Sequence, residues 1–192
     1  MATRFTMNPS SLPFTCEVCI LAGGLSTRMG RDKARLRLNR RTMLGVIRAR
    51  AKHLGLRVRV IRRDLKPRCG PLGGIYTALK TTRFEAVLFL ACDMPFVSPA
   101  LLQRVLGTFR PGQSALFVRK GKRVGFPFLL PHSALPVVVN QLTRAEFSLQ
   151  NVATILKAKT IQMPRAMSGE LFNINTPAEW ENARERVANA LL

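Results

Sequence analysis

Short apolar runs alternate along this chain with longer stretches in which apolar residues recur every three or four positions. The short runs predict strands, because strand side chains repeat every two residues and a buried strand is apolar on both faces. The longer stretches have the spacing of one face of a helix. The pattern predicts strands at 16–22, 56–61 and 85–91, and helices at 42–55, 73–81 and 98–109.

The second half of the chain is less regular. Two apolar runs flank the turn Lys120-Gly121-Lys122 and predict a hairpin. Pro127 falls in the second run and is expected near an edge of the sheet, because proline has no N–H for the ladder. The hairpin strands are expected at 114–119 and 124–130, helices at 132–144, 148–158 and 176–192, and short strands at 160–163 and 171–174.

Two of these helices begin with capping signals. Ser98 precedes Pro99, which suits an N-cap followed by proline at the first helical position. Thr176 and Glu179 have the spacing of a capping box, with Pro177 between them. Both signals mark where helices start.

Strands that alternate with helices predict an α/β domain with a largely parallel sheet. Residues 1–14 lack the apolar core of a signal peptide and are interpreted as a flexible tail, within which Met7 could be the true start. The remainder, 15–192, is expected to be one domain. No apolar run approaches the length of a membrane span.

The charge of the chain changes this picture. Its 192 residues include 31 Lys and Arg against 10 Asp and Glu, a net charge of +21. Between Arg28 and Arg68, 16 basic and two acidic residues give a net +14. Such an excess attracts anions, including nucleic acid, acidic membranes, nucleotides and acidic proteins, and it is equally compatible with a solvated, Arg-rich surface.

Four cysteines do not make a disulfide framework in a chain of this length. Cys16 and Cys19 have C-x-x-C spacing but lie in the first apolar run, with no second pair and no histidine at metal-binding spacing. We expect buried thiols rather than a zinc or redox site, which fits a reducing cytoplasm.

The stretch Ile20–Leu36, ILAGGLSTRMGRDKARL, has the composition of a phosphate-binding loop. Gly23 and Gly24 follow the first strand, and without Cβ atoms they let backbone N–H groups close around an anion. Arg28 and Lys33 can supply charge from the same loop. Glycines that only turn the chain, and a surface lysine, remain the simpler alternative for each residue taken alone.

Two acidic residues follow other predicted strands. Asp93 comes directly after the run 85–91 and suits Mg²⁺, which prefers oxygen ligands, although a turn aspartate is the alternative. Asp64 lies six residues before a second glycine-rich turn, Gly70-Pro71-Leu72-Gly73-Gly74, which opens a helix and suits anions. Ligands of parallel sheets bind beyond the carboxyl ends of the strands, where these loops are expected.

The segment LAGGLSTRMGRDKARL strongly resembles the first signature of molybdenum cofactor guanylyltransferases, within the wider nucleotidyltransferases of GT-A-like fold. GPLGGIYTAL, LFLACDMPF and FNINTPAEW are similar to that family's later motifs, in the same order. The resemblance covers about residues 18–181 and implies a three-layer α/β/α Rossmann-like nucleotidyltransferase domain with a mostly parallel sheet.

The resemblance also implies roles for individual residues. It assigns Asp93 to Mg²⁺, and it places Asn173 and Asn175 on the acceptor side. It implies catalytic roles for Lys33, Arg28 and Asp93. The nucleotide-binding residues that it implies are Leu21, Ala22, Gly23, Gly24, Lys33, Asp64, Gly70, Pro71 and Asp93.

By this resemblance, GMP passes from GTP to the terminal phosphate of molybdopterin, with Mg²⁺ as cofactor and pyrophosphate as leaving group. Molybdoenzymes or other proteins of cofactor biosynthesis could be partners, and the location would be cytoplasmic. The chain departs from the family between Gly55 and Asp64, where there is room for about one strand instead of two. CTP, or a different phosphate or sugar-phosphate acceptor, therefore stays open as an alternative.

A basic nucleic-acid-binding protein without catalysis is a third hypothesis, motivated by the net charge. Only 7% of the residues are aromatic, with one Trp and one Tyr. A platform for stacking bases is therefore poorly supplied, which argues against this hypothesis.

Overall fold

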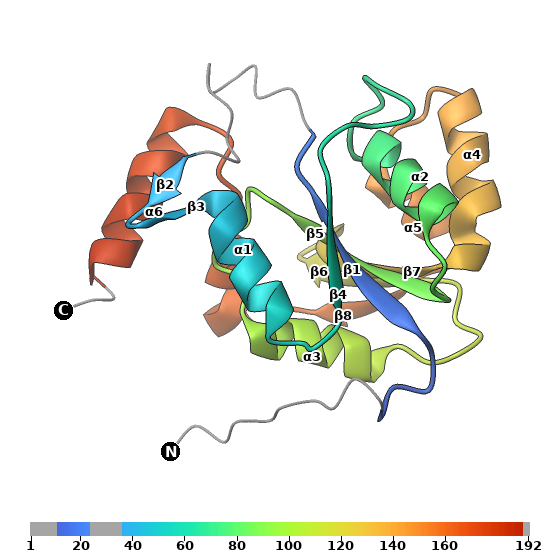
Figure 1. Cartoon of the computed structure of the whole chain (residues 1–192), viewed down its shortest axis with the longest axis horizontal. Coiled ribbons are helices and arrows are strands. Elements are labelled where there is room, and N and C mark those ends of the chain that lie inside the picture. The colour runs from blue at the N-terminus through green and yellow to red at the C-terminus, as the bar shows by residue number, and fades with distance from the viewer. Residues whose placement is uncertain (1–10, 24–35, 190–192) are drawn as a thin grey trace.

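A six-stranded sheet forms the centre of the protein in a computed structural model that describes residues 11–23 and 36–189 (Figure 1). The strand order is β4-β1-β5-β7-β6-β8. Among the described strands of this sheet, β7 alone runs opposite to the others, so the sheet is mostly parallel as expected. The strands are β1 Cys16–Leu21, β4 Arg57–Ile61, β5 Ala86–Ala91, β6 Leu116–Lys120, β7 Arg123–Pro131 and β8 Lys159–Gln162.

Helices cover both faces of the sheet, which confirms the three-layer arrangement (Figure 1). On one face, α1 Met43–Lys52 and α3 Pro99–Thr108 bury residues such as Ile47 and Leu102. The opposite face is covered by α2 Pro71–Thr81, α4 Leu135–Thr143 and α5 Leu149–Ile155.

A small hairpin and the last helix stand beside this sandwich (Figure 1). The hairpin consists of β2 Arg37–Leu38 and β3 Arg41–Thr42, which the sequence pattern did not predict because each strand is two residues long. The helix α6 Pro177–Asn189 packs its buried Ala183 into a third apolar cluster with Leu38 of the hairpin.

The alternation of side chains along the strands separates the two main cores. Val18 and Ile20 of β1 face α1 and α3, whereas Cys19 faces α2 together with Phe89 and Phe128. The rings of Phe89 and Phe128 stack with their centroids 5.1 Å apart. Of the amino-terminal residues expected to form a tail, Phe14 is buried and its ring packs edge-on against Phe109.

The C-x-x-C pair lies on β1 with its two thiols on opposite faces of the sheet. Cys16 belongs to the core beneath α1 and α3, and Cys19 to the core beneath α2. Burial raises the pKa of each thiol to about 12. The prediction of buried thiols is confirmed, because both side chains are buried.

Two sequence predictions about the second half of the chain are wrong. Pro127 is buried in β7, which lies between β5 and β6 and not at an edge. It is tolerated there because the register with β6 shifts beside Phe117, so a bulge removes the need for its N–H. The segment 171–174 is not a strand. Leu171 is the last residue of the 3₁₀ helix η4 Arg165–Leu171, and the Ile174 N–H donates to the carbonyl of Asp93 in a loop instead of to a neighbouring strand.

The helix starts behave as expected. The Ser98 side chain accepts a hydrogen bond from the Leu101 N–H at 3.1 Å. Thr176 and Glu179 form a reciprocal capping box, in which the Glu179 carboxylate accepts from the Thr176 N–H at 2.9 Å. Within the described ranges, no helix has the length and apolar character needed to cross a bilayer.

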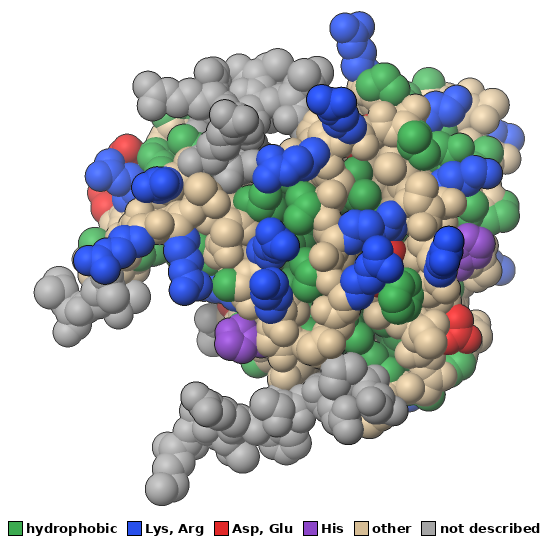
Figure 2. All heavy atoms as spheres, viewed as in Figure 1, with side chains coloured by type: hydrophobic (Ala, Val, Ile, Leu, Met, Phe, Trp, Pro, Cys, Tyr) green, Lys and Arg blue, Asp and Glu red, His purple; other side chains and the backbone are tan. Residues whose placement is uncertain are grey.

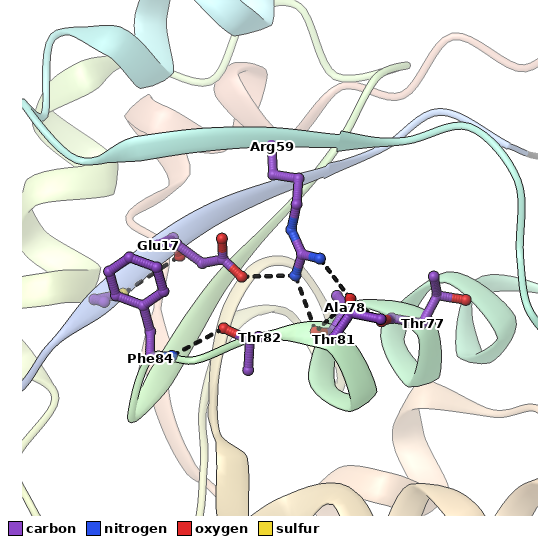
Figure 3. A network of polar contacts seen from close by, with 8 residues as sticks. Glu17, Arg59, Thr77, Ala78, Thr81, Thr82 and Phe84 are labelled. Atoms are coloured by element: carbon purple, nitrogen blue, oxygen red, sulfur yellow. Dashed lines mark hydrogen bonds and ion pairs between the residues drawn. The ribbon is translucent and has the colours of Figure 1, made fainter.

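A buried ion pair joins the edge strand β4 to the rest of the sheet (Figure 3). Arg59 donates to the Glu17 carboxylate of β1 at 2.6 Å and to the Ala78 carbonyl of α2 at 2.9 Å, and it also donates to the Thr81 hydroxyl. The Glu17 side chain is 2% exposed and that of Arg59 is 21% exposed. One guanidinium thus satisfies a buried carboxylate and the carboxyl end of a helix.

Replacing Glu17 by alanine is expected to lower the free energy of unfolding by about 3 kcal/mol, because Arg59 would keep a partly buried charge without its partner. Urea unfolding followed by circular dichroism measures the change. The control is Glu181→Ala, which removes an exposed pair with Arg184 and is expected to cost about 0.5 kcal/mol or less. Equal effects of the two substitutions would contradict a structural role for the Glu17–Arg59 pair.

Candidate functional site

The candidate site is built at the carboxyl edge of the sheet, where three parallel strands end side by side. Leu21, the last residue of β1, is in register with Ile61 of β4 and with Ala91 of β5. The Ala22 N–H continues the ladder to the Ile61 carbonyl at 2.8 Å, and the Cys92 N–H donates to the Leu21 carbonyl at 3.1 Å. The loops that follow these strands therefore leave the sheet together.

Asp64, in the loop after β4, lies against the two glycine-rich segments. A Cβ added at Gly73 would lie 2.8 Å from the Asp64 Oδ2 atom and 2.4 Å from the Lys66 carbonyl oxygen. A Cβ added at Gly74 would lie 3.3 Å from the Asp64 Oδ1 atom, and one at Gly23 would lie 3.4 Å from it. The carboxylate is thus packed between the end of β1 and the first turn of α2, which only glycine permits at this distance.

Thr77 holds this loop in place from within α2. Its hydroxyl accepts from the Leu65 N–H at 2.8 Å and donates to the Gly73 carbonyl at 2.8 Å. The residue after Asp64 is therefore tied to the turn of helix that Asp64 touches. Sequence analysis did not select Thr77, and the available signal was a small polar residue four positions after a helix-opening glycine.

The surroundings of Asp64 change its acidity. Burial raises the pKa of this carboxyl group above its usual value, since the charged form is less well solvated there. Perturbed carboxyl groups are common at functional sites, although structural networks produce them too. A carboxylate between two glycine-rich segments can accept hydrogen bonds from the N–H or O–H groups of a bound ligand.

Asp93 follows β5 at the same edge and is joined to the segment that carries Asn173 and Asn175. The Ile174 N–H donates to the Asp93 carbonyl at 2.9 Å, and the Ile174 side chain is fully buried. The two asparagines flank Ile174, so the structure brings them to the neighbourhood of Asp93 although 80 residues separate Asp93 from Asn173 in the chain.

Asp93 has the chemistry that a magnesium ion needs, provided that the substrate supplies the other ligands. Among residues 11–23 and 36–189, no group of three or more His, Cys, Asp or Glu side chains could hold a metal ion by itself. Mg²⁺ is commonly held by one or two carboxylates together with phosphate oxygens and water. Asp93 therefore fits such a site as one carboxylate ligand.

The face shown in Figure 2 is strongly basic over α1 and β4. Between residues 36 and 68 the chain has 12 Lys and Arg and a single acid, Asp64. Most of these basic side chains are exposed, among them Arg48, Arg62 and Arg63. A field of this sign attracts anionic ligands to the adjacent edge and is weakened by salt.

The structure thus brings together part of the predicted site. Leu21, Ala22 and Gly23 end β1, and Asp64 contacts the segment opened by Gly70 and Pro71, where Gly70 precedes α2 and Pro71 begins it. The predicted residues Gly24, Arg28 and Lys33 lie outside the described part of the chain.

A pocket of about 610 Å³ lies elsewhere, between the β2–β3 hairpin, α1 and the segment after Asp93. Neither Asp64 nor Asp93 lines it. The residues that line it are Leu38, Asn39, Arg40, Arg41, Val46, Arg50, Pro95, Phe96 and Val187. The loops that carry Gly23, Asp64 and Asp93 instead leave the sheet at its carboxyl edge, which makes that edge the candidate site.

This fold, in which loops meet at the carboxyl edge of a mostly parallel sheet, is that of the nucleotidyltransferases. The molybdopterin-guanine dinucleotide biosynthesis protein A of Archaeoglobus fulgidus superposes with a TM-score of 0.71 at 21% identity, over 90% of this chain and 99% of that one. The 2-C-methyl-D-erythritol 4-phosphate cytidylyltransferase of Thermus thermophilus has a TM-score of 0.65 at 17% identity, over 90% and 98% of the two chains.

Residues 18–159 match the model of the MobA-like NTP transferase domain, and the chain belongs to that family of nucleotidyltransferases. A probable molybdenum cofactor guanylyltransferase of Carboxydothermus hydrogenoformans is 31% identical over 183 residues, which cover 85% of this chain and 92% of the relative. The molybdenum cofactor guanylyltransferase of Pseudomonas entomophila is 30% identical over 195 residues, which cover 88% and 97%. The resemblance found in the motifs is confirmed.

Replacing Gly73 by alanine is expected to displace Asp64 or to destabilise the first turn of α2, because the added methyl group would collide with the Lys66 backbone. We expect a loss of about 1–3 kcal/mol in the free energy of unfolding. Gly107→Ala is the matched control: this glycine lies in α3 with open space around its Cα, so alanine is expected to be neutral or to stabilise by up to about 1 kcal/mol. Chemical denaturation separates the two cases, and a neutral Gly73→Ala would refute the close approach.

Proposed function

We propose that this protein transfers GMP from GTP to the terminal phosphate of molybdopterin, or of the molybdenum cofactor, and releases pyrophosphate. The observation that carries the proposal is that the strands before Gly23, Asp64 and Asp93 all end at one edge of the sheet, where Asp64 lies against the glycine-rich segments. The acceptor is suggested by relatives named molybdenum cofactor guanylyltransferases, which match nearly the whole length of the chain.

The proposed reaction needs little proton transfer by the protein. A phosphate monoester has a second pKa near 6, so the attacking oxygen is already largely ionised at neutral pH. This oxygen forms a bond to the α-phosphorus of GTP while the bond between that phosphorus and the bridging oxygen to the β-phosphate breaks. The electron pair leaves with pyrophosphate, and catalysis therefore depends mainly on position and charge neutralisation.

Each proposed residue has a role in that scheme. Asp93 would hold Mg²⁺, which when bound supplies positive charge to the phosphate oxygens. Arg28 and Lys33, which the resemblance places in the phosphate-binding loop, would bind the triphosphate. The backbone of Leu21, Ala22 and Gly23 would line the nucleotide at the end of β1.

The acceptor would enter beside Asp93. Asn173 and Asn175 flank the residue that bonds the Asp93 backbone, and amides can both donate to and accept from the polar groups of a pterin. The basic residues between 36 and 68 would raise the local concentration of two anionic substrates.

The segment between α1 and Asp64 bears on which base the protein recognises. A single strand, β4, lies between α1 and Asp64, so the extra segment expected for the family has no counterpart here. Transfer from CTP, or to a different phosphate acceptor, is therefore the second candidate. Asp64 and the turn at Gly70 and Pro71 are the described groups closest to this question.

The substitution Asp93→Asn should lower the rate at which pyrophosphate is released from GTP in the presence of molybdopterin by about 100-fold or more, because one negatively charged metal ligand is lost. A coupled phosphate assay with Mg²⁺ measures the rate. The control is Glu146→Gln, which removes an exposed carboxylate and should leave the rate unchanged. An unchanged rate in Asp93→Asn, or no release by the unaltered protein, would overturn the proposal.

Saturating GTP with Mg²⁺ should raise the melting temperature more than CTP, ATP or UTP does. At 100 times the dissociation constant, binding stabilises a protein by about 2.7 kcal/mol, which corresponds to roughly 5–10 °C for a chain of this size. Differential scanning fluorimetry gives the comparison in one experiment. A larger shift with CTP would instead favour cytidylyl transfer. No shift with any of the four nucleotides would contradict nucleotidyl transfer.

A further inference from the structure

A cationic pocket lies at the opposite end of the sheet from the proposed nucleotide site. It has a volume of about 280 Å³ and is formed where β1 and β4 begin and α2 ends. Glu17, which lines it, is separated from Leu21 at the carboxyl end of β1 by roughly 13 Å, given about 3.3 Å per strand residue. Its lining residues are Glu17, Arg57, Arg59, Thr81, Thr82, Arg83 and Phe84.

Three guanidinium groups therefore face one carboxylate in this pocket. Glu17 is 2% exposed, and its carboxylate accepts from Arg59 at 2.6 Å (Figure 3). Glu85, which directly follows the lining residue Phe84, accepts two hydrogen bonds from Thr15, at 2.6 Å from the N–H and 3.0 Å from the hydroxyl. The formal charge of the lining is thus +2, which a dianion would neutralise.

Arg59 also removes the main obstacle to an anion at this position. The carboxyl end of a helix carries partial negative charge and would repel an anion. Arg59 donates to the Ala78 carbonyl at 2.9 Å and to the Thr81 hydroxyl in the last turn of α2 (Figure 3). Because the Arg59 guanidinium already binds Glu17 and the end of α2, it positions the wall of the pocket and is not the main ligand-binding group.

The remaining donors are available for a ligand. Arg57 and Arg83 are exposed, and within the described part of the chain neither forms an ion pair. The Thr82 oxygen accepts from the Phe84 N–H at 3.2 Å, which leaves the hydroxyl hydrogen able to donate. Two guanidinium groups and a hydroxyl around a small hollow match the acceptor oxygens of a phosphoryl group.

We propose that this pocket binds a phosphate dianion, either free phosphate or the phosphoryl group of a small monoester, at a site separate from the nucleotide edge. Its volume is below the 300–1,000 Å³ typical of pockets that enclose a drug-sized molecule, which favours a small anion over a whole nucleotide. Arg57 and Arg83 bind the phosphate oxygens, Thr82 donates a third hydrogen bond, and the Glu17–Arg59 pair holds the floor.

The test is isothermal titration calorimetry of the full chain with inorganic phosphate and, separately, with ribose 5-phosphate. The Arg57→Ala/Arg83→Ala double variant should bind the phosphoryl probe about 10-fold more weakly or not measurably, since it loses both free guanidinium groups. The matched control is Arg104→Ala/Arg123→Ala, which removes the same charge from exposed positions on α3 and β7 and should bind like the unaltered protein.

The two probes distinguish free phosphate from an esterified phosphoryl group. Loss of binding for either probe in the Arg57/Arg83 variant alone supports the site. Equal binding by the two double variants would overturn it, because phosphate would then bind only elsewhere, such as at the nucleotide edge. Absence of binding by the unaltered protein up to about 10 mM of both probes would overturn it as well.

Discussion

The close approach of α2 to the loop after β4 is the constraint on which the candidate site depends. Gly73 and Gly74 allow the first turn of the helix to touch the Asp64 carboxylate, and Thr77 ties the same loop to the same turn. Because β4 is in register with β1, this contact also fixes Asp64 beside Gly23. A side chain at any of these glycines would push apart the end of β1, Asp64 and the first turn of α2.

The parallel alignment of β1, β4 and β5 also brings Asp93 to this edge of the sheet. Their carboxyl ends meet at one edge, which places Asp93 next to the end of β1. The late segment around Ile174 then bonds the Asp93 backbone and adds two asparagines to that edge. A reaction that depends on position and charge, with little proton transfer, needs such convergence more than it needs a single reactive side chain.

At the opposite end of the sheet, a buried charge pair stabilises the fold. Arg59 serves both Glu17 and the end of α2, so β4, an edge strand rich in arginine, is bound firmly to its neighbours. The helix α2 therefore contacts Asp64 at its first turn and Arg59 at its last. Some basic side chains, such as Arg59, therefore stabilise the fold, whereas others are exposed and can attract anions. The net charge alone does not distinguish the two groups.

Local patterns in the sequence were sufficient for most of the elements and for the family of the protein. The apolar runs predicted β1 and β5, the Ser98 and Thr176 caps predicted the starts of α3 and α6, and the ordered motifs predicted a nucleotidyltransferase. These signals are short in range, since a strand, a cap or a glycine turn depends on residues within one or two turns of chain. The tertiary structure decided what depends on distant pairing: Pro127 in an interior strand, Ile174 on the Asp93 backbone, and Arg59 on Glu17. Such contacts follow from strand order and register, which join segments that no local pattern relates.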